Sequence, residues 1–343
     1  MRKDATDMKI IMDVMGGDKG PGEVIKGALE GRKALNIDIL LVGDENVIRE
    51  EAEKLQLDLT DIEIVHASDV ITMEDDPMSV RQKPESSMRV ALRQLTEGNG
   101  DALVSCGNTG ALQTGATLYV KRIRGVHRAA IATVMPLTIP TLMLDSGANI
   151  SVTEEHLTQF AIMGSVYMEK LYGLESPRVG LLNNGSEEKK GTPLHQEAHQ
   201  WLKECDVNFV GNVEGKDIPF GKCDVVVTDG FTGNVALKSL EGMASFVVGL
   251  FKDIFKSNVL GLAAAALIKK KLDAVKKRMD ARAHGGAPLL GISRPVIKAH
   301  GNSDAMSITS AMRQAVTYYN TGVIAEIAKR CAEESKKRER IDE

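Results

Sequence analysis

Aromatic residues are scarce in this chain of 343 residues, where they make up 4% of the sequence and include a single tryptophan. The formal net charge at pH 7 is only -4, so the chain has no overall basic field that would attract nucleic acid. Few aromatic rings also leave few platforms on which bases could stack. Both features argue against a nucleic-acid-binding protein.

Cysteine is sparse as well, and the four cysteines are scattered, with no CxxC spacing and no His pairs beside them. We therefore predict neither a zinc site nor a disulfide framework, and no metal or other cofactor. The chain has no window of 18 uninterrupted apolar residues, and the segment before its first apolar run lacks the core of a signal peptide. These absences predict a cytoplasmic protein.

Hydrophobic residues, at 43% of the sequence, are abundant enough for a large core. Short apolar runs without polar alternation, such as Val179–Leu182 and Val225–Thr228, alternate with stretches of helical spacing. This alternation predicts a doubly wound α/β fold, in which helices cover both faces of a mostly parallel sheet. We expect residues 1–343 to form a single domain.

Two segments suggest local departures from this plan. Ala130–Met135 and Thr141–Leu144 are separated by two prolines, which predicts a β-hairpin at a sheet edge. The helix predicted over Glu154–Tyr172 carries a face of small residues, which suits either a dimer seam or a contact within the chain.

The C-terminal part is predicted to contain one last helix over Ala305–Lys329. The residues that follow, Glu333–Glu343, are mostly charged, and we expect a frayed tail there.

Glycine-rich polar turns follow several of the apolar runs, at residues 13–18, 105–111, 183–192, 228–234 and 298–304. Where such a turn leads into a helix, the first amide groups have no partner within the helix, and glycine lets a ligand approach the backbone. The turns therefore predict an anion-binding site. A polar, proline-containing loop over residues 69–87 is long enough to cover a site.

Common motifs do not account for these turns. Ile25 stands where a dinucleotide-binding GxGxxG requires its third glycine, and the lysines near Gly191 precede the last glycine, unlike those of a P-loop. His300, Ser303 and Asp304 lie too close in sequence for a nucleophilic triad. His300 remains open as a proton donor, a ligand-binding group or a structural histidine.

A basic segment stands out near the C-terminal third, within a helical stretch that we place at residues 245–285. Residues 256–282 carry eight Lys or Arg against two Asp. Apolar and basic residues interleave at helical spacing, which predicts a protruding basic amphipathic segment that binds an acidic protein or an anionic membrane surface. A helical hairpin packed in a dimer is the alternative. The candidate contact residues are Leu260, Leu267, Ile268, Lys269, Lys270, Lys271 and Leu272.

Taken together, the motifs DxMGGD at 13–18, SxGNTGA at 105–111, GxxxKKG at 185–191, TDGFTGN at 228–234 and KAHGxSD at 298–304 resemble the bacterial phosphate acyltransferase family of phospholipid synthesis (PlsX type). The resemblance covers nearly the full chain. It implies a fold like that of phosphotransacetylases and isopropylmalate dehydrogenases, and a homodimer attached peripherally to the inner face of the membrane. The implied reaction turns acyl-[acyl carrier protein] and phosphate into acyl phosphate and free carrier protein, which would feed a downstream membrane acyltransferase.

The resemblance also implies roles for individual residues. Lys190 would neutralise phosphate or the developing oxyanion, and Asn234 would donate a hydrogen bond to the reacting oxygen. Asn108 and Thr109 would position phosphate, whereas His300 is a further catalytic candidate without an assigned role. The remaining candidate substrate-binding residues are Asp13, Gly16, Gly17, Asp18, Gly107, Gly110, Asp229, Gly230, Thr232, Gly233 and Ser303.

Three departures from the family pattern occur: Cys106, Ser186 and an extra polar stretch before Met8. The Cys106 departure argues against a cysteine nucleophile. Two other functions remain open: a short-chain phosphotransacetylase that uses coenzyme A, and a non-catalytic scaffold that recruits acyl carrier protein to the membrane surface. A dehydrogenase of related fold is weaker, because the nicotinamide fingerprint fails.

Overall fold

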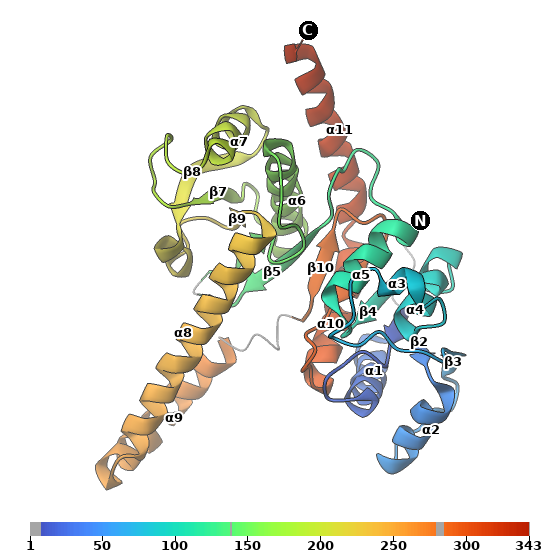
Figure 1. Ribbon diagram of the computed structural model, residues 1–343. Coiled ribbons are helices and arrows are strands. Elements are labelled where there is room, and N and C mark those ends of the chain that lie inside the picture. The colour runs from blue at the N-terminus through green and yellow to red at the C-terminus, as the bar shows by residue number, and fades with distance from the viewer. Residues whose placement is uncertain (1–7, 138, 279–284, 343) are drawn as a thin grey trace.

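The computed structural model describes residues 8–137, 139–278 and 285–342. Its named strands form one 11-stranded sheet in the order β3-β2-β1-β4-β11-β10-β5-β6-β9-β7-β8 (Figure 1). Neighbouring strands pair in parallel except at β11–β10, β10–β5 and β5–β6. The mostly parallel sheet predicted from the sequence is therefore confirmed. The strands are β1 (Lys9–Asp13), β2 (Asp38–Gly43), β3 (Glu63–His66), β4 (Ala102–Ser105), β5 (Ala130–Met135), β6 (Thr141–Leu144), β7 (Arg178–Asn183), β8 (Asn208–Glu214), β9 (Val225–Val227), β10 (Ala287–Leu290) and β11 (Val296–Lys298).

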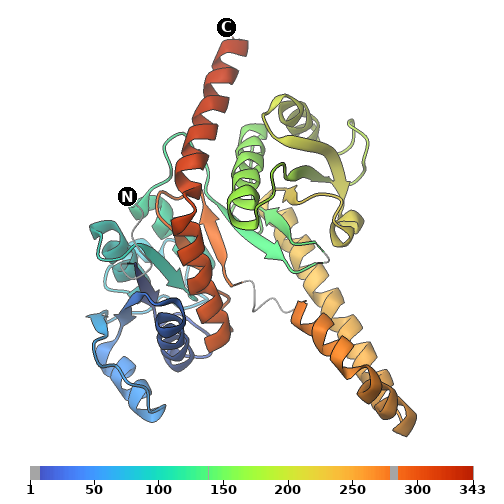
Figure 2. The same cartoon turned by 180° about the vertical axis from the view of Figure 1, so that it is seen from behind.

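Helices flank the sheet on both faces (Figures 1 and 2). A π-helical turn, Ala116–Val120, extends α5, and a short 3-10 helix, Gly215–Phe220, precedes β9. The α-helices are α1 (Pro21–Leu35), α2 (Glu45–Lys54), α3 (Ser79–Gln82), α4 (Ser87–Glu97), α5 (Thr109–Gly115), α6 (Glu154–Tyr172), α7 (Pro193–Glu204), α8 (Gly230–Lys256), α9 (Val259–Arg278), α10 (Ala305–Asn320) and α11 (Val323–Asp342).

The half of the sheet from β3 to β11 is covered by α1 and α10 on one face and by α4 and α5 on the other. Alternation along β1 explains this arrangement, because successive side chains of a strand point to opposite faces. Ile10 and Met12 belong to the core cluster that includes Ile25 of α1 and Ile308 of α10. Ile11 belongs instead to the cluster that includes residues of α4 and α5. Both faces of the strand are thus buried, as its uninterrupted apolar sequence predicts.

The other half, from β5 to β8, is packed on one face by α6. A Cβ atom at Gly164 of α6 would lie 2.6 Å from Cγ1 of Val225 in β9, so the small residue is needed for this helix to approach the sheet. The neighbouring residues Leu157, Ala161 and Met168 are fully buried in the same core. Of the two interpretations of this small-residue face, the structure supports the contact within the chain.

The predicted hairpin of β5 and β6 forms, but its expected place at a sheet edge is wrong. The pair occupies the middle of the sheet, between β10 and β9. Pro136 and Pro140 lie outside both strands, so they remove no hydrogen bond from the ladder. The prolines therefore mark the ends of the two strands and do not indicate whether the pair lies at an edge of the sheet.

The C-terminal end also differs from expectation. The predicted last helix is divided at Gly322, whose φ is 71°, and α11 then continues to Asp342. Arg338 stacks over the ring of Trp201 at 4.4 Å and pairs with Glu204 at 2.8 Å. These contacts with α7 hold in a helix the residues that we expected to fray.

The two helices α8 and α9 project together from the body as a hairpin (Figures 1 and 2), in agreement with the predicted protruding hairpin. Along α8, only Gly230 and Gly233 are buried. By length and composition α8 passes the test for a membrane-spanning helix, with a mean hydropathy of 1.2 in a window of which none is buried. A single such helix is weak evidence for a membrane span.

Candidate active site

Asp13, at the end of β1, is fully buried beside the turn that follows β4. Its Oδ2 accepts a hydrogen bond of 2.6 Å from Ser105, whose Oγ accepts one of 3.1 Å from the amide of Gly107. A Cβ at Gly16 would lie 2.5 Å from Cα of Gly107, so the two turns touch backbone to backbone. Burial raises the pKa of Asp13, although hydrogen bonds with Ser105 and Ser87 partly offset this effect.

Asn108 caps α5 and also holds the long loop predicted to cover the site. Its Oδ1 accepts from the amide of Ala111, and its Nδ2 donates to the carbonyls of Thr72, Met73 and Asp75 at 3.2, 3.1 and 2.9 Å. The segment 69–87 therefore lies on this turn, but it is not wholly the loop that was predicted, because it contains the short helix α3 and Ser87 begins α4. The side chain of Asn108 is already engaged, which leaves Thr109 and Gly110 as the half-buried residues of the turn.

Lys298, the last residue of β11, is a buried charged residue at this end of the sheet and was not among the predicted site residues. Its Nζ donates to the carbonyl of Cys106 at 3.1 Å and to the carbonyl of Ala299. Burial lowers the pKa of Lys298 to about 8, although the charges of Asp18 and Asp13 oppose this shift. The sequence contains one signal for this residue, which is a lysine at the end of an apolar run. Such a lysine stands out because lysine is rarely buried without a partner.

The turn after β11 completes this side of the site. The amide of Asp18 donates to the carbonyl of Gly301 at 2.8 Å, and the amide of Ser303, a buried residue, donates to the carbonyl of His300 at 3.0 Å. Asp304 caps α10 through Ser307, so His300, Ser303 and Asp304 do not act as a triad. This agrees with the sequence-based rejection.

Across from these turns, the first residues of α8 press against the turn after β6. Asp145 in that turn accepts hydrogen bonds from the amides of Gly147, Ala148 and Asn149. A Cβ at Gly233 would lie 2.0 Å from the carbonyl oxygen of Asp145. Gly233 of TDGFTGN thus lets the start of α8 pack against the turn after β6. The sequence instead suggested that the glycines of this motif let a ligand approach the backbone.

Asp229 is the N-cap of α8, and its Oδ1 accepts from the amide of Thr232 at 2.8 Å. One of the first amide groups of the helix is therefore satisfied within the chain. Burial lowers the pKa of His195, at the start of α7, and the charge of Asp229 opposes that shift. The turn at 183–192, which leads into α7, thus lies close to the start of α8.

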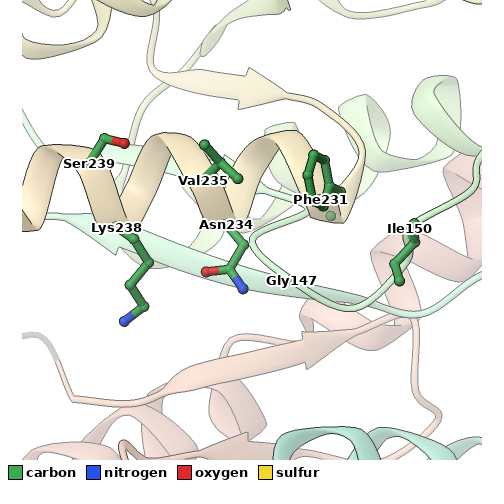
Figure 3. Close-up of a pocket in the computed structure, with 8 residues that line it drawn as sticks. Gly147, Ile150, Phe231, Asn234, Val235, Lys238 and Ser239 are labelled. Carbon is green, nitrogen blue, oxygen red and sulfur yellow. The ribbon is translucent and has the colours of Figure 1, made fainter.

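An open cavity of about 620 Å³ lies beside the first turns of α8. Figure 3 shows Asn234 and Lys238 extending from the same side of the helix, whereas Val235 and Ser239 point to the other side. The side chain of Asn234 makes no hydrogen bond to any residue that the structure describes. The lining residues are Gly147, Ile150, Gly230, Phe231, Asn234, Val235, Lys238 and Ser239.

Comparison with known proteins gives the family. A model described as fatty acid synthesis protein matches residues 8–326. The chain is 46% identical over 323 residues to a phosphate acyltransferase of Thermoanaerobacter pseudethanolicus. The matched region covers 93% of this chain and 96% of that protein. It is 46% identical over 313 residues to a phosphate acyltransferase of Geobacillus sp., with 90% and 94% covered. The chain belongs to the phosphate acyltransferase family.

Solved structures agree with the fold of this phosphate acyltransferase family member. A phosphotransacetylase from Streptococcus pyogenes superposes with a TM-score of 0.62 at 16% identity, over 93% of this chain and 94% of that one. A putative 4-hydroxythreonine-4-phosphate dehydrogenase from Salmonella typhimurium gives a TM-score of 0.53 at 12% identity, over 91% and 99%. At these identities the likeness concerns the fold alone.

In this phosphate acyltransferase the predicted site residues fall into two groups. The first lies on the turns after β1, β4 and β11, and the second on α8 and the exposed turn that carries Lys190. His300 is where the groups meet: burial lowers its pKa, and the charges of Lys238 on α8 and of Lys298 lower it further. Among the described residues, no group of three or more His, Cys, Asp or Glu is placed to hold a metal ion.

Burial raises the pKa of the Cys106 thiol to about 12, so this side chain stays protonated at neutral pH. A thiol is a poor nucleophile in that form. The position of Cys106 next to the site is therefore no argument for a covalent acyl-cysteine.

Proposed function

We propose that the chain transfers a long-chain acyl group from acyl carrier protein to inorganic phosphate, releasing acyl phosphate and free carrier protein for phospholipid synthesis. Membership of the phosphate acyltransferase family supports the reaction type. The observation that carries the choice of substrate is the cavity beside α8. It combines Asn234 and Lys238 with the apolar side chains of Ile150, Phe231 and Val235, as a long acyl thioester requires.

In the proposed mechanism a phosphate oxygen attacks the thioester carbonyl directly. The carbonyl oxygen gains negative charge, the carbon–sulfur bond breaks, and the leaving sulfur takes up a proton to give the free thiol. Phosphate is already ionised near neutral pH, so the enzyme's main tasks are to hold the anion, align it with the carbonyl and stabilise the oxyanion. Lys190 and Asn234 are proposed for the last task, and the turns at 13–18 and 105–111 for the first.

Replacing Lys190 or Asn234 with alanine tests this assignment. Loss of one oxyanion donor typically lowers turnover by about a hundred- to a thousandfold, and we expect that range for acyl phosphate release. Lys189→Ala, which removes an exposed lysine of the same turn, and Ser239→Ala, which changes the same cavity, are the matched controls. Near-wild-type turnover in folded Lys190→Ala and Asn234→Ala enzymes would show that the assignment is wrong.

Two alternative functions can be distinguished from the proposed one by experiment. A short-chain phosphotransacetylase would release acyl phosphate from acetyl coenzyme A, whereas the proposed enzyme should need a long acyl chain on carrier protein. A non-catalytic scaffold would bind acyl carrier protein without releasing acyl phosphate. A single assay of acyl phosphate formation with both thioesters separates the three functions.

We also propose that the enzyme is a cytoplasmic homodimer that attaches peripherally to an anionic membrane surface, where its product meets a downstream membrane acyltransferase. Support comes from the hairpin of α8 and α9. It exposes large apolar residues along its length together with three exposed lysines, Lys269–Lys271. Clusters of exposed apolar residues on a surface are typical of contacts with a membrane or another protein. Exposed large apolar residues of the hairpin include Met243, Phe246, Ile254, Val259, Leu260 and Leu267.

A further inference from the structure

Lys298 is a buried cation that makes no ion pair with any carboxylate among the residues that the structure describes. Its relative exposure is 8%, and Asp13 and Asp18 act on it through space without a salt bridge. A buried charge without a close counter-charge is costly. The fold therefore places at the carboxyl end of β11 an ammonium group that a bound anion would stabilise.

The surroundings of Lys298 are built from three turns. Its Nζ donates to the carbonyls of Cys106 and Ala299, so it joins the turn after β4 to the turn after β11. The turn after β1 reaches the same place, because the amide of Asp18 donates to the carbonyl of Gly301. An ammonium group has three N–H donors, and two of them are used here. The third has no hydrogen-bond partner within the described part of the chain.

A second observation points to the same place. Oδ1 of Asp13 is fully buried and has no well-formed hydrogen bond, although Ser87 and the amide of Met15 lie close enough to lower the pKa of this carboxyl group. Buried polar atoms are nearly always satisfied, so exceptions call for an explanation. Two incompletely satisfied groups of opposite charge type thus lie beneath the same three turns.

We propose that Lys298 is the cation of the phosphate subsite, and that the turns after β1, β4 and β11 hold the phosphate above it. This inference rests on the proposed use of phosphate as a substrate. It adds a residue to the site and assigns the phosphate to the turns after β1, β4 and β11, apart from the cavity that Asn234 lines. The thioester carbonyl would then lie between the two groups, next to α8.

Protonation separates this role from a purely structural one. A neutral amine still has two N–H donors, which suffice for the carbonyls of Cys106 and Ala299, so deprotonation removes the charge and leaves the link between the turns. The groups that face Lys298 are Asp13, Asp18, Cys106 and His300. Because the pKa of Lys298 is about 8, the charge is present at pH 7 and lost as the pH rises above 8.

The test is the affinity of the full-length enzyme for inorganic phosphate between pH 7 and pH 9, measured from the phosphate-dependent shift in melting temperature. With a pKa of about 8, the protonated fraction of Lys298 falls about tenfold over this range, and we expect the affinity for the phosphate dianion to fall about tenfold with it. Phosphate itself becomes more fully dianionic over the same range, so its own ionisation opposes the expected loss.

Variants assign the effect to Lys298. Lys298→Met should bind phosphate weakly at pH 7 and show no further loss toward pH 9, whereas Lys298→Arg should keep its affinity at pH 9. The matched control is Lys222→Met, which removes a lysine paired with Asp217 away from the site and should behave as wild type. A ratio of wild-type to Lys298→Arg affinity that is the same at pH 7 and pH 9 overturns the proposal, because phosphate ionises alike in both experiments.

Acyl phosphate assays of the same proteins keep the two proposals apart. If wild type forms acyl phosphate and Lys298→Met has an unchanged KM for phosphate, the inference about Lys298 is wrong and the proposed function stands. If wild type forms no acyl phosphate but binds phosphate with the expected pH dependence, the proposed function is wrong and the phosphate subsite stands.

Discussion

His300 is the residue at which the charges of the two groups of candidate site residues act together. Burial lowers its pKa below the ordinary value for histidine, and the charges of Lys238 and Lys298 lower it further, whereas Glu241 and Asp18 act in the opposite direction. Its imidazole is therefore mostly neutral at pH 7, with one nitrogen able to donate and the other able to accept. A neutral His300 adds no charge of its own to a site meant for a dianion.

Removing the charge of Lys238 is expected to raise the pKa of His300. Lys238 disfavours the imidazolium ion, so Lys238→Met shifts the loss of the proton to higher pH, and the released Glu241 acts in the same direction. The pKa can be followed through the NMR signals of the imidazole ring. Lys222→Met is the control and should leave the titration unchanged. A pKa that falls or stays constant in Lys238→Met would contradict the placement of Lys238 near His300.

Individual residues differ in how far the sequence could predict them. Asp229 was identified from the motif, and the structure places it at the start of α8. Asn108 was identified for a ligand, but its side chain is engaged with three carbonyls of a loop more than 30 residues away, a contact that no local pattern encodes. Lys298 was overlooked because its significance depends on burial by neighbouring strands, which the sequence does not show directly.

At the scale of elements, the buried strands and their helices were predictable because apolar runs and helical spacing are local signals. The strand order was not. β5 and β6 lie in the middle of the sheet because β10 arrives from far along the chain and pairs with β5. The end of α11 depends in the same way on Arg338 and Trp201. Both wrong predictions, the edge hairpin and the frayed tail, concern long-range contacts, which the hydrophobic periodicity of a sequence cannot reveal.

The close packing of α6 on β9 leads to a prediction for two glycines. Gly164→Ala introduces a methyl group 2.6 Å from Val225, so we expect a loss of about 1–3 kcal/mol in the free energy of unfolding. Gly242→Ala in α8 has no atom within 4 Å of the new methyl group and replaces a poor helix former, so it should be neutral or stabilising by up to ~1 kcal/mol. Urea denaturation measures both changes.

The same pair of variants separates internal packing from a subunit contact. Gly164→Ala should leave the sedimentation coefficient of the folded enzyme unchanged, because its effect arises within one chain. An unchanged denaturation midpoint together with weaker self-association would instead favour a dimer seam on α6.

At the scale of the whole molecule, helix α8 belongs both to the candidate active site and to the hairpin. The first turns of α8 line the cavity through Asn234 and Lys238, and the rest of the helix leaves the body with its apolar side chains exposed (Figure 1). The sequence suggested an amphipathic segment centred on α9. The structure shows that α8 exposes at least as much apolar surface, because apart from its first turns it lies away from the core. A membrane or protein that binds this hairpin would therefore contact the same helix that carries the proposed site residues Asn234 and Lys238.

Membrane attachment is tested by making the hairpin polar while leaving the site intact. Leu267 is 87% exposed and Ile268 is 39% exposed, so replacing both with glutamate removes apolar contact area and adds negative charge beside Lys269–Lys271. We expect wild type to sediment with vesicles of anionic lipid and the double variant to remain in the supernatant. Because neither residue lines the cavity, turnover of soluble acyl carrier protein should be retained.

The control for this experiment is the pair Leu55→Glu and Leu118→Glu, which changes two exposed leucines outside the hairpin. This variant should sediment with vesicles as wild type does. Raising the salt concentration should weaken binding in the wild type, because the contribution of the lysines is screened whereas that of the apolar residues is not. If the Leu267 and Ile268 variant sediments normally but Phe246→Glu with Phe251→Glu does not, the lipid contact belongs to α8. If both sediment normally and the second variant fails to dimerise, the exposed face of α8 is the contact between two copies of the chain.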